Sequence, residues 1–281
     1  MTYIVNPVQH ARNWRILVVG CGGTGGYVAE GLCRLLIGSN IPLVLIDGDR
    51  VEPHNIRRQN FYPGDEGKFK SQVLAERLAR QFSRGVGYCV WPYDSELVGE
   101  NWGQHMHTNL VEGLIIGCVD NAPARASIAN RWKLSNWWID AGNGSSSGQI
   151  LIGNTPAIEQ LEAGFHQDEH AVDRLPIPSL QLPALLMPTP GPAASRGCAE
   201  AVIADDQSPV INQAMANLVI QFVYRFLTRR LTWMGAYIDL DAGSFQTVPA
   251  EPVVVARMLG VKVDTLMANR CSLGNRYSLR R

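Results

Sequence analysis

Basic and amide side chains are concentrated in a short segment after Asp47, and they suit the chemistry of a bound triphosphate. Asn55, Arg58, Gln59 and Lys70 all lie in this segment. Arg and Lys can neutralise the charge of the phosphates while the α-phosphorus is attacked, and this stabilises the transition state. A nicotinamide cofactor needs little positive charge here, so the segment favours a nucleoside triphosphate.

A glycine-rich turn between an apolar run and a helix-like segment precedes these residues. The apolar run Ile16–Val19 leads into the turn, a helix-like segment follows, and a second run, Pro42–Ile46, ends at Asp47. This order is typical of nucleotide binding, because helix amides face a phosphate and the acid accepts from ribose hydroxyls. Asp49 is a second acidic residue that is predicted to bind the nucleotide. The glycines predicted to approach the nucleotide are Gly20, Gly22, Gly23 and Gly25.

A third element, Leu114–Val119, ends on Asp120 and Asn121. It places Asp120 at the carboxyl end of a strand, where ligands bind in open α/β sheets. A carboxylate there suits Mg²⁺, which is held through one or two carboxylates and the phosphates of a substrate. Asp120 and Asn121 could also cap the helix that begins near Pro123, and the two roles are compatible.

These elements, in this order, resemble the ThiF/MoeB family of ATP-dependent activators, which is related to ubiquitin-activating enzymes. Within that family the chain is similar to the ThiF-like proteins of the plasmid-borne PRTRC gene system. The resemblance covers about residues 12–155 well and returns near Cys198–Leu227. The segments that carry it are Gly20–Gly25, Asp47–Gln59, Gly67–Lys70, Val119–Asn121 with Arg125, and Trp138–Gln149.

The resemblance implies an adenylyltransferase with ATP and Mg²⁺ as cofactors. A small ubiquitin-like or sulfur-carrier protein would offer its C-terminal carboxylate to the α-phosphorus, and pyrophosphate would leave. The family also implies a homodimer, with Arg12 as a candidate for reaching the neighbouring site. Cys198 is a candidate catalytic nucleophile because related activators form a thioester after the crossover loop, although a family subset does not need this cysteine.

Three other functions stay open from the sequence. Another small-molecule or RNA-linked carboxylate could be adenylated instead of a protein. An NAD-dependent Rossmann dehydrogenase would explain Gly20–Gly25 and Asp47, but it would leave Lys70 and Asp120 without a role. A nucleotide-sensing scaffold without catalysis is the third alternative.

Composition narrows the class of partner. The chain has 25 basic and 25 acidic residues, so no overall charge favours nucleic acid or an anionic membrane. No apolar run reaches the ~20 residues of a membrane span, and we expect a cytoplasmic protein without membrane contact. No zinc is expected, because the cysteines form no C-x-x-C pair. They are Cys21, Cys33, Cys89, Cys118, Cys198 and Cys271.

The hydrophobic pattern predicts an α/β protein with a Rossmann-like three-layer fold, whose mainly parallel sheet is extended by C-terminal antiparallel strands. A single adenylation domain would span 1–281, with a nucleotide-binding core at 1–155, a Pro-rich crossover loop at 156–200 and C-terminal elements at 201–281. Residues 1–15 are expected to be irregular or briefly helical. Strands are predicted near 16–20, 42–47, 86–92, 113–118, 137–140, 148–152, 235–241 and 244–248, and helices near 25–37, 70–83, 123–134 and 208–227.

Overall fold

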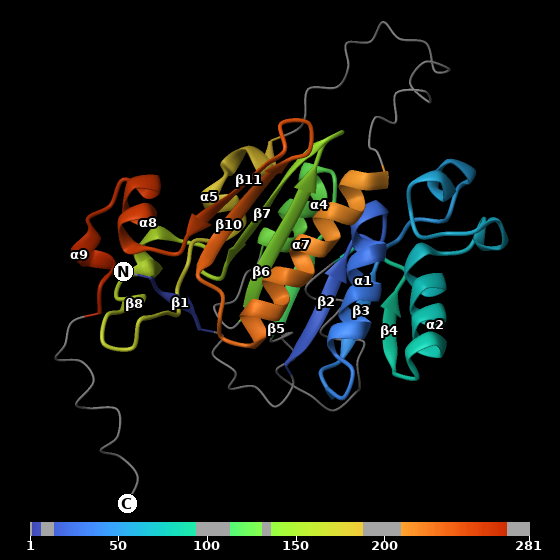
Figure 1. Cartoon of the computed structure of the whole chain (residues 1–281), viewed down its shortest axis with the longest axis horizontal. Coiled ribbons are helices and arrows are strands. Elements are labelled where there is room, and N and C mark those ends of the chain that lie inside the picture. The colour runs from blue at the N-terminus through green and yellow to red at the C-terminus, as the bar shows by residue number, and fades with distance from the viewer. Residues whose placement is uncertain (1, 7–13, 94–112, 131–135, 188–208, 269–281) are drawn as a thin grey trace, which may run out of the picture.

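The computed structural model describes residues 2–6, 14–93, 113–130, 136–187 and 209–268, and Figure 1 shows their arrangement. An eight-stranded sheet with the order β11-β10-β7-β6-β5-β2-β3-β4 runs through the centre. Its strands are β2 (Arg15–Val19), β3 (Leu43–Ile46), β4 (Val86–Cys89), β5 (Gly113–Gly117), β6 (Asn136–Asn143), β7 (Ser147–Gly153), β10 (Trp233–Asp239) and β11 (Ser244–Pro249).

The direction of the strands divides this sheet into two halves. From β4 to β6 all neighbours are parallel, whereas β7, β10 and β11 are added in antiparallel fashion. The predicted fold class, a mainly parallel sheet with C-terminal antiparallel strands, is therefore confirmed. Because parallel strands end at one edge, the residues that follow β2, β3 and β5 are brought together there.

Helices cover both faces of the sheet, which explains why the central parallel strands β2, β3 and β5 are mostly apolar. Ile16 and Val18 of β2 pack into the larger core cluster, with residues of α1 (Gly23–Leu35), α2 (Lys70–Phe82) and α7 (Pro209–Leu227). Leu17 and Val19 point to the other face. There they pack with Ile128 of α4 (Ala122–Ala129), and α5 (Pro178–Gln181) lies beside β6 and β7. Figure 1 shows α7 and α1 side by side along one face.

The predicted helices at 25–37, 70–83 and 208–227 correspond to α1, α2 and α7. Two predicted elements are shorter than expected. The strand predicted at 86–92 ends at Cys89, and the helix predicted at 123–134 ends at Ala129. Residues 131–135, at the end of that prediction, lie outside the described residues. None of the helices in the described ranges is long and apolar enough to cross a membrane.

The described part of the segment predicted as a Pro-rich crossover loop, 156–200, ends at 187 and contributes to the core. Leu161, Phe165 and Leu175 are fully or almost fully buried in the larger core. Prolines begin two of the short helical elements here, because a proline is accepted at the first position of a helix. Pro178 begins α5, and Pro183 begins a 3₁₀ turn, η4 (Pro183–Leu186). Another such turn is η3 (Ile158–Leu161).

Both ends of the chain contain elements that the pattern did not predict. The lead-in expected to be irregular contains β1 (Ile4–Val5), which joins β9 (Ala171–Val172) and β8 (Phe165–His166) in a three-stranded sheet. Helices α8 (Pro252–Leu259) and α9 (Val263–Leu266) follow β11. The two-residue strands and the four-residue helix α9 are too short to show a period, so only their tertiary contacts define them.

Candidate functional site

A cavity of about 750 Å³ opens at the carboxyl ends of β2, β3, β4 and β5. Its volume lies within the usual range of about 300–1,000 Å³ for ligand pockets. The structure brings ten of the predicted cofactor-binding residues to its walls. They are Gly20, Gly22, Gly23, Asp47, Asp49, Arg58, Gln59, Lys70, Asp120 and Asn121.

The glycine turn after β2 forms one wall and has the geometry of an anion site. Gly20 has φ +88°, and a Cβ there would lie 2.6 Å from the carbonyl oxygen of Cys118. No side chain caps α1 at Gly22, so the first N–H groups of the helix have no such partner and can bind an anion. Gly25 does not line the cavity. Its hydrogen takes the place of a Cβ that would meet the carbonyl oxygen of Gly20 at 1.8 Å.

Asp47 is oriented by the backbone around it. One carboxylate oxygen accepts the N–H of Cys21 at 2.6 Å, and the other accepts the N–H of Asp49 at 2.8 Å. Burial raises the pKa of Asp47, whereas the two backbone N–H groups and the ammonium of Lys70 act in the opposite direction. The hydroxyl of Ser71 also donates to the backbone carbonyl oxygen of Asp47 at 2.8 Å. The carboxylate is thus fixed before any ligand arrives, and its remaining lone pairs can accept from ribose hydroxyls.

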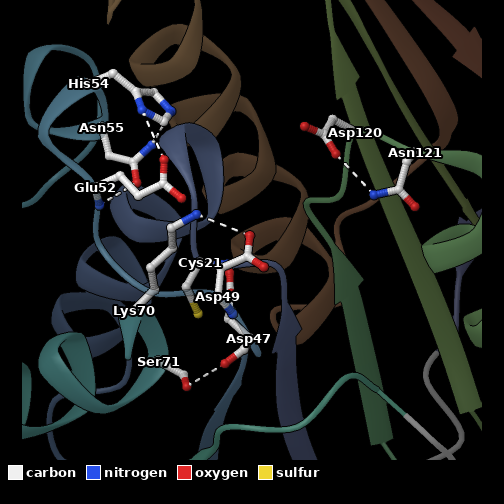
Figure 2. A network of polar contacts seen from close by, with 10 residues as sticks. All are labelled: Cys21, Asp47, Asp49, Glu52, His54, Asn55, Lys70, Ser71, Asp120 and Asn121. Carbon is white, nitrogen blue, oxygen red and sulfur yellow. Dashed lines mark hydrogen bonds and ion pairs between the residues drawn. The ribbon is translucent and has the colours of Figure 1, made fainter. Parts of the chain in front are cut away.

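Lys70 reaches the cavity from the first turn of α2. It is 8 % exposed, and its Nζ lies 3.1 Å from a carboxylate oxygen of Asp49, which is itself largely exposed. Figure 2 shows this pair beside Asp47. Arg58 follows the 3₁₀ turn η1 (Pro53–Arg57) and lines the same cavity. Two cations and the free amides of a helix end therefore share one wall, which suits a polyanion.

Asp120 and Asn121 lie across the cavity from Lys70, as Figure 2 shows. Asn121 caps α4 by accepting the N–H of Ala124 at 2.9 Å, as the capping alternative predicted, and it also donates to Asp120 at 3.1 Å. Asp120 is exposed at the strand end. Within the described ranges, no three His, Cys, Asp or Glu side chains gather that could hold a metal alone. A lone carboxylate fits Mg²⁺ that is shared with substrate phosphates.

Asn55 and Gln59 occupy different surroundings, although both are buried. Asn55 lies outside the cavity lining. Its side chain accepts the N–H of Glu52 at 3.0 Å and contacts the ring of His54 at 2.9 Å, so it is engaged in holding η1 together (Figure 2). Gln59 lines the cavity, and its Oε1 has no hydrogen-bond partner among the described residues. A ligand donor would satisfy that oxygen.

A buried ion pair beneath the cavity was not among the predicted site residues. Arg125 of α4 donates through Nε to both carboxylate oxygens of Asp140 in β6, at 3.1 and 3.2 Å. Asp140 has no exposed surface, and burial raises its pKa to about 6 although Arg125 opposes the shift. The register of β5 and β6 places Asp140 opposite Gly117. A Cβ on Gly117 would lie an ordinary 3.5 Å from Oδ1 of Asp140, but only 3.1 Å from Ile128 and Trp138. The acid within an apolar strand was the available signal in the sequence.

Aromatic and amide side chains also line the cavity without having been predicted. Trp91 and Tyr93 follow β4 beside Asp47, and 67 % of Trp91 is exposed. Thr24, Asn143 and Asn212 line the end near α7. Arg57 and Lys68, which lie close in sequence to Arg58 and Lys70, are exposed and do not line the cavity. Cys198 and Arg12 lie outside the described residues, so their roles stay predictions.

Comparisons with known proteins support this reading of the fold. The chain is 34% identical over 160 residues to ubiquitin-like modifier-activating enzyme 5 of Dictyostelium discoideum, and 33% identical over 160 residues to that of Rattus norvegicus. Each match covers 53% of this chain, but only 41% and 38% of the relatives. The chain therefore matches about two-fifths of the length of these curated relatives.

Two solved structures share the fold. Crystal structures of PaaA and of E. coli MccB with MccA each give a TM-score of 0.54, at 19% and 17% identity. They cover 84% and 86% of this chain, and 64% and 66% of theirs. The profile of the ThiF family matches residues 3–252, which includes every element that lines the cavity. The chain belongs to the ThiF family.

Proposed function

We propose that this chain is an adenylyltransferase that uses ATP to activate the carboxylate of a partner. The observation that carries the proposal is the convergence on one cavity of an oriented acid, two cations and an exposed acid at a strand end. These are Asp47, Lys70 with Arg58, and Asp120. Membership of the ThiF family and the identity to activating enzymes of ubiquitin-like modifiers support the same chemistry.

Each wall of the cavity has a role in this reaction. Asp47 accepts from the ribose hydroxyls, and Trp91 and Tyr93 offer aromatic surface beyond it for the base. The N–H groups at the start of α1, with Lys70 and Arg58, hold the phosphates. Asp120 would hold Mg²⁺, which supplies charge neutralisation on the phosphates when bound.

The bond changes require little from the protein beyond position and charge. A carboxylate oxygen of the partner attacks the α-phosphorus, the bond to the bridging oxygen of the β-phosphate breaks, and pyrophosphate leaves with the electron pair. The attacking carboxylate is ionised at neutral pH and needs no general base. The described residues that line the cavity include no histidine, in keeping with catalysis by placement and electrostatics.

The partner that best fits is a small ubiquitin-like or sulfur-carrier protein with a free C-terminal carboxylate. The relatives named above are activating enzymes of ubiquitin-like modifiers, and one of the structural neighbours was crystallised with MccA. Hydride transfer with NAD is the weaker alternative, because it leaves Lys70, Arg58 and Asp120 without a function at the cavity where they meet.

Partner-dependent exchange of pyrophosphate into ATP tests the proposal. Lys70→Ala, Arg58→Ala and Asp120→Ala should each reduce the exchange rate by roughly 10²-fold, the usual effect of losing one electrostatic contact to a transition state. Lys68→Ala and Arg57→Ala are the matched controls, since both side chains are neighbours in sequence but exposed outside the cavity. Wild-type exchange in one of the three cavity variants would remove that residue from the site, and wild-type exchange in all three would refute the assignment.

A further inference from the structure

The start of α7 is joined to three other segments of the cavity wall by one side chain. Asn212 is 1 % exposed and lines the cavity, although it lies far along the chain from the nucleotide motifs. Its Oδ1 accepts from Nδ2 of Asn143 at 3.2 Å and from the hydroxyl of Thr24 at 3.5 Å. Its Nδ2 donates to the carbonyl oxygen of Arg58 at 3.5 Å.

The side chain of Asn212 packs closely against the start of α1. A Cβ on Gly23 would lie 2.3 Å from Nδ2 of Asn212, so the carboxamide rests directly on the first turn of α1. The single hydroxyl proton of Thr24 is shared between Oδ1 of Asn212 and the nearer Oδ1 of Asn143, at 3.0 Å. Asn212 thus contacts the glycine turn, the end of β6 and the backbone of the residue predicted to bind phosphate.

We infer that Asn212 is a positioning residue for the phosphate end of the site, and this rests on the proposed function. By holding the backbone of Arg58 against the first turn of α1, it sets the distance between the guanidinium and the helix amides that share the same wall. An amide is suited to this task because it can accept from one segment and donate to another at once. A small displacement of a binding group can reduce a rate by roughly 10²-fold. Replacing Asn212 should therefore reduce the rate more than removing a surface contact does.

The test is a double-mutant cycle between Asn212 and Arg58, read from kcat/KM for ATP in pyrophosphate exchange. Asn212→Ala should reduce kcat/KM by roughly 10- to 100-fold. In the Arg58→Ala background the same change should reduce kcat/KM by only about 2-fold. The effects of two substitutions are not additive when one residue acts through the other. Gln213→Ala is the control, since Gln213 also contacts α1, through the hydroxyl of Tyr27 at 3.4 Å, but is exposed outside the cavity.

The cycle separates positioning from a general loss of structure. A purely structural role would lower the melting temperature and give equal losses in both backgrounds, and that result would overturn the inference, as would wild-type kinetics in Asn212→Ala. If the alanine variant does not fold, Asn212→Ser takes its place, because its shorter side chain cannot reach both Asn143 and Arg58.

The inference and the proposed function can fail separately. Calorimetric titration with ATP repeats the same cycle on the dissociation constant, without any partner. If the wild type binds ATP but catalyses no exchange, the proposed function fails, and the cycle on affinity still decides the role of Asn212. If the wild type binds no ATP, both are overturned.

Discussion

The glycine turn offers the sharpest prediction, because two adjacent glycines of α1 differ in what a methyl group would meet. A Cβ on Gly25 would lie 1.8 Å from the backbone carbonyl oxygen of Gly20, whereas a Cβ on Gly26 would meet its nearest atom, Cβ of Asn60, at 3.5 Å. Gly25→Ala therefore forces the turn and the helix apart, and Gly26→Ala makes ordinary contacts.

The two substitutions should change the free energy of unfolding in opposite directions. Replacing glycine by alanine inside a helix stabilises it by roughly 0.5–1 kcal/mol, so Gly26→Ala should raise the free energy of unfolding by about that amount. In Gly25→Ala the same gain is outweighed, since overpacking typically costs about 1–3 kcal/mol and the clash here is with backbone. The Gly25 variant should also lose ATP affinity, because the turn that it displaces lines the cavity at Gly20.

Urea unfolding of both variants at one pH, with the slope m compared, gives the two free energies. The free energy of unfolding of Gly26→Ala should lie slightly above that of the wild type. That of Gly25→Ala should lie below it, by a larger amount. If Gly25→Ala is as stable as the wild type, the turn is not packed as described. If Gly26→Ala is destabilised to the same extent, helix packing in general, and not the contact with Gly20, explains the effect.

Three further outcomes are expected. The first concerns Asp140. Relative to Asp140→Asn, the free energy of unfolding of the wild type should fall by about 3 kcal/mol as the pH rises from roughly 4 to 7. The reason is that the pKa of Asp140 is raised to about 6 in the folded protein from an ordinary 3.8, so the folded state binds more protons in this window; a difference that is independent of pH would contradict it. Cys198→Ala should retain pyrophosphate exchange, since adenylation needs no sulfur, and a reducible covalent adduct with the partner that only the mutant lacks would identify Cys198 as a nucleophile. Sedimentation should detect a homodimer, whereas a monomer with full exchange activity would rule out a shared site.

Most of the central sheet could be predicted because its signals are local. The apolar run of β2, the glycines after it and the acid after β3 each follow from the conformations that neighbouring residues permit. The same holds for α2, whose apolar face repeats with the helical period. Placing Asp47 and Asp120 near one another needed only one further rule, that parallel strands end at the same edge of a sheet.

Side-chain partnerships across the fold could not be read in this way. Asn55 and Gln59 belong to one motif, yet the structure places Asn55 within η1 and Gln59 at the cavity. Asn212 carries no local pattern that distinguishes it from other polar residues of a helix. Its importance arises only when the fold brings α7 against α1 and β6.

The amino-acid sequence by itself determined the strand–turn–helix order, the nucleotide motifs and the family likeness, because periodicity and turn chemistry act over a few residues. Tertiary structure decided that Arg125 pairs with Asp140, since their meeting depends on the register of β5 against β6 and on the direction of α4. It also decided that Phe165 and Leu175, in a segment rich in proline, are part of the core. Burial of a short segment is a property of what packs around it, and no local pattern encodes that.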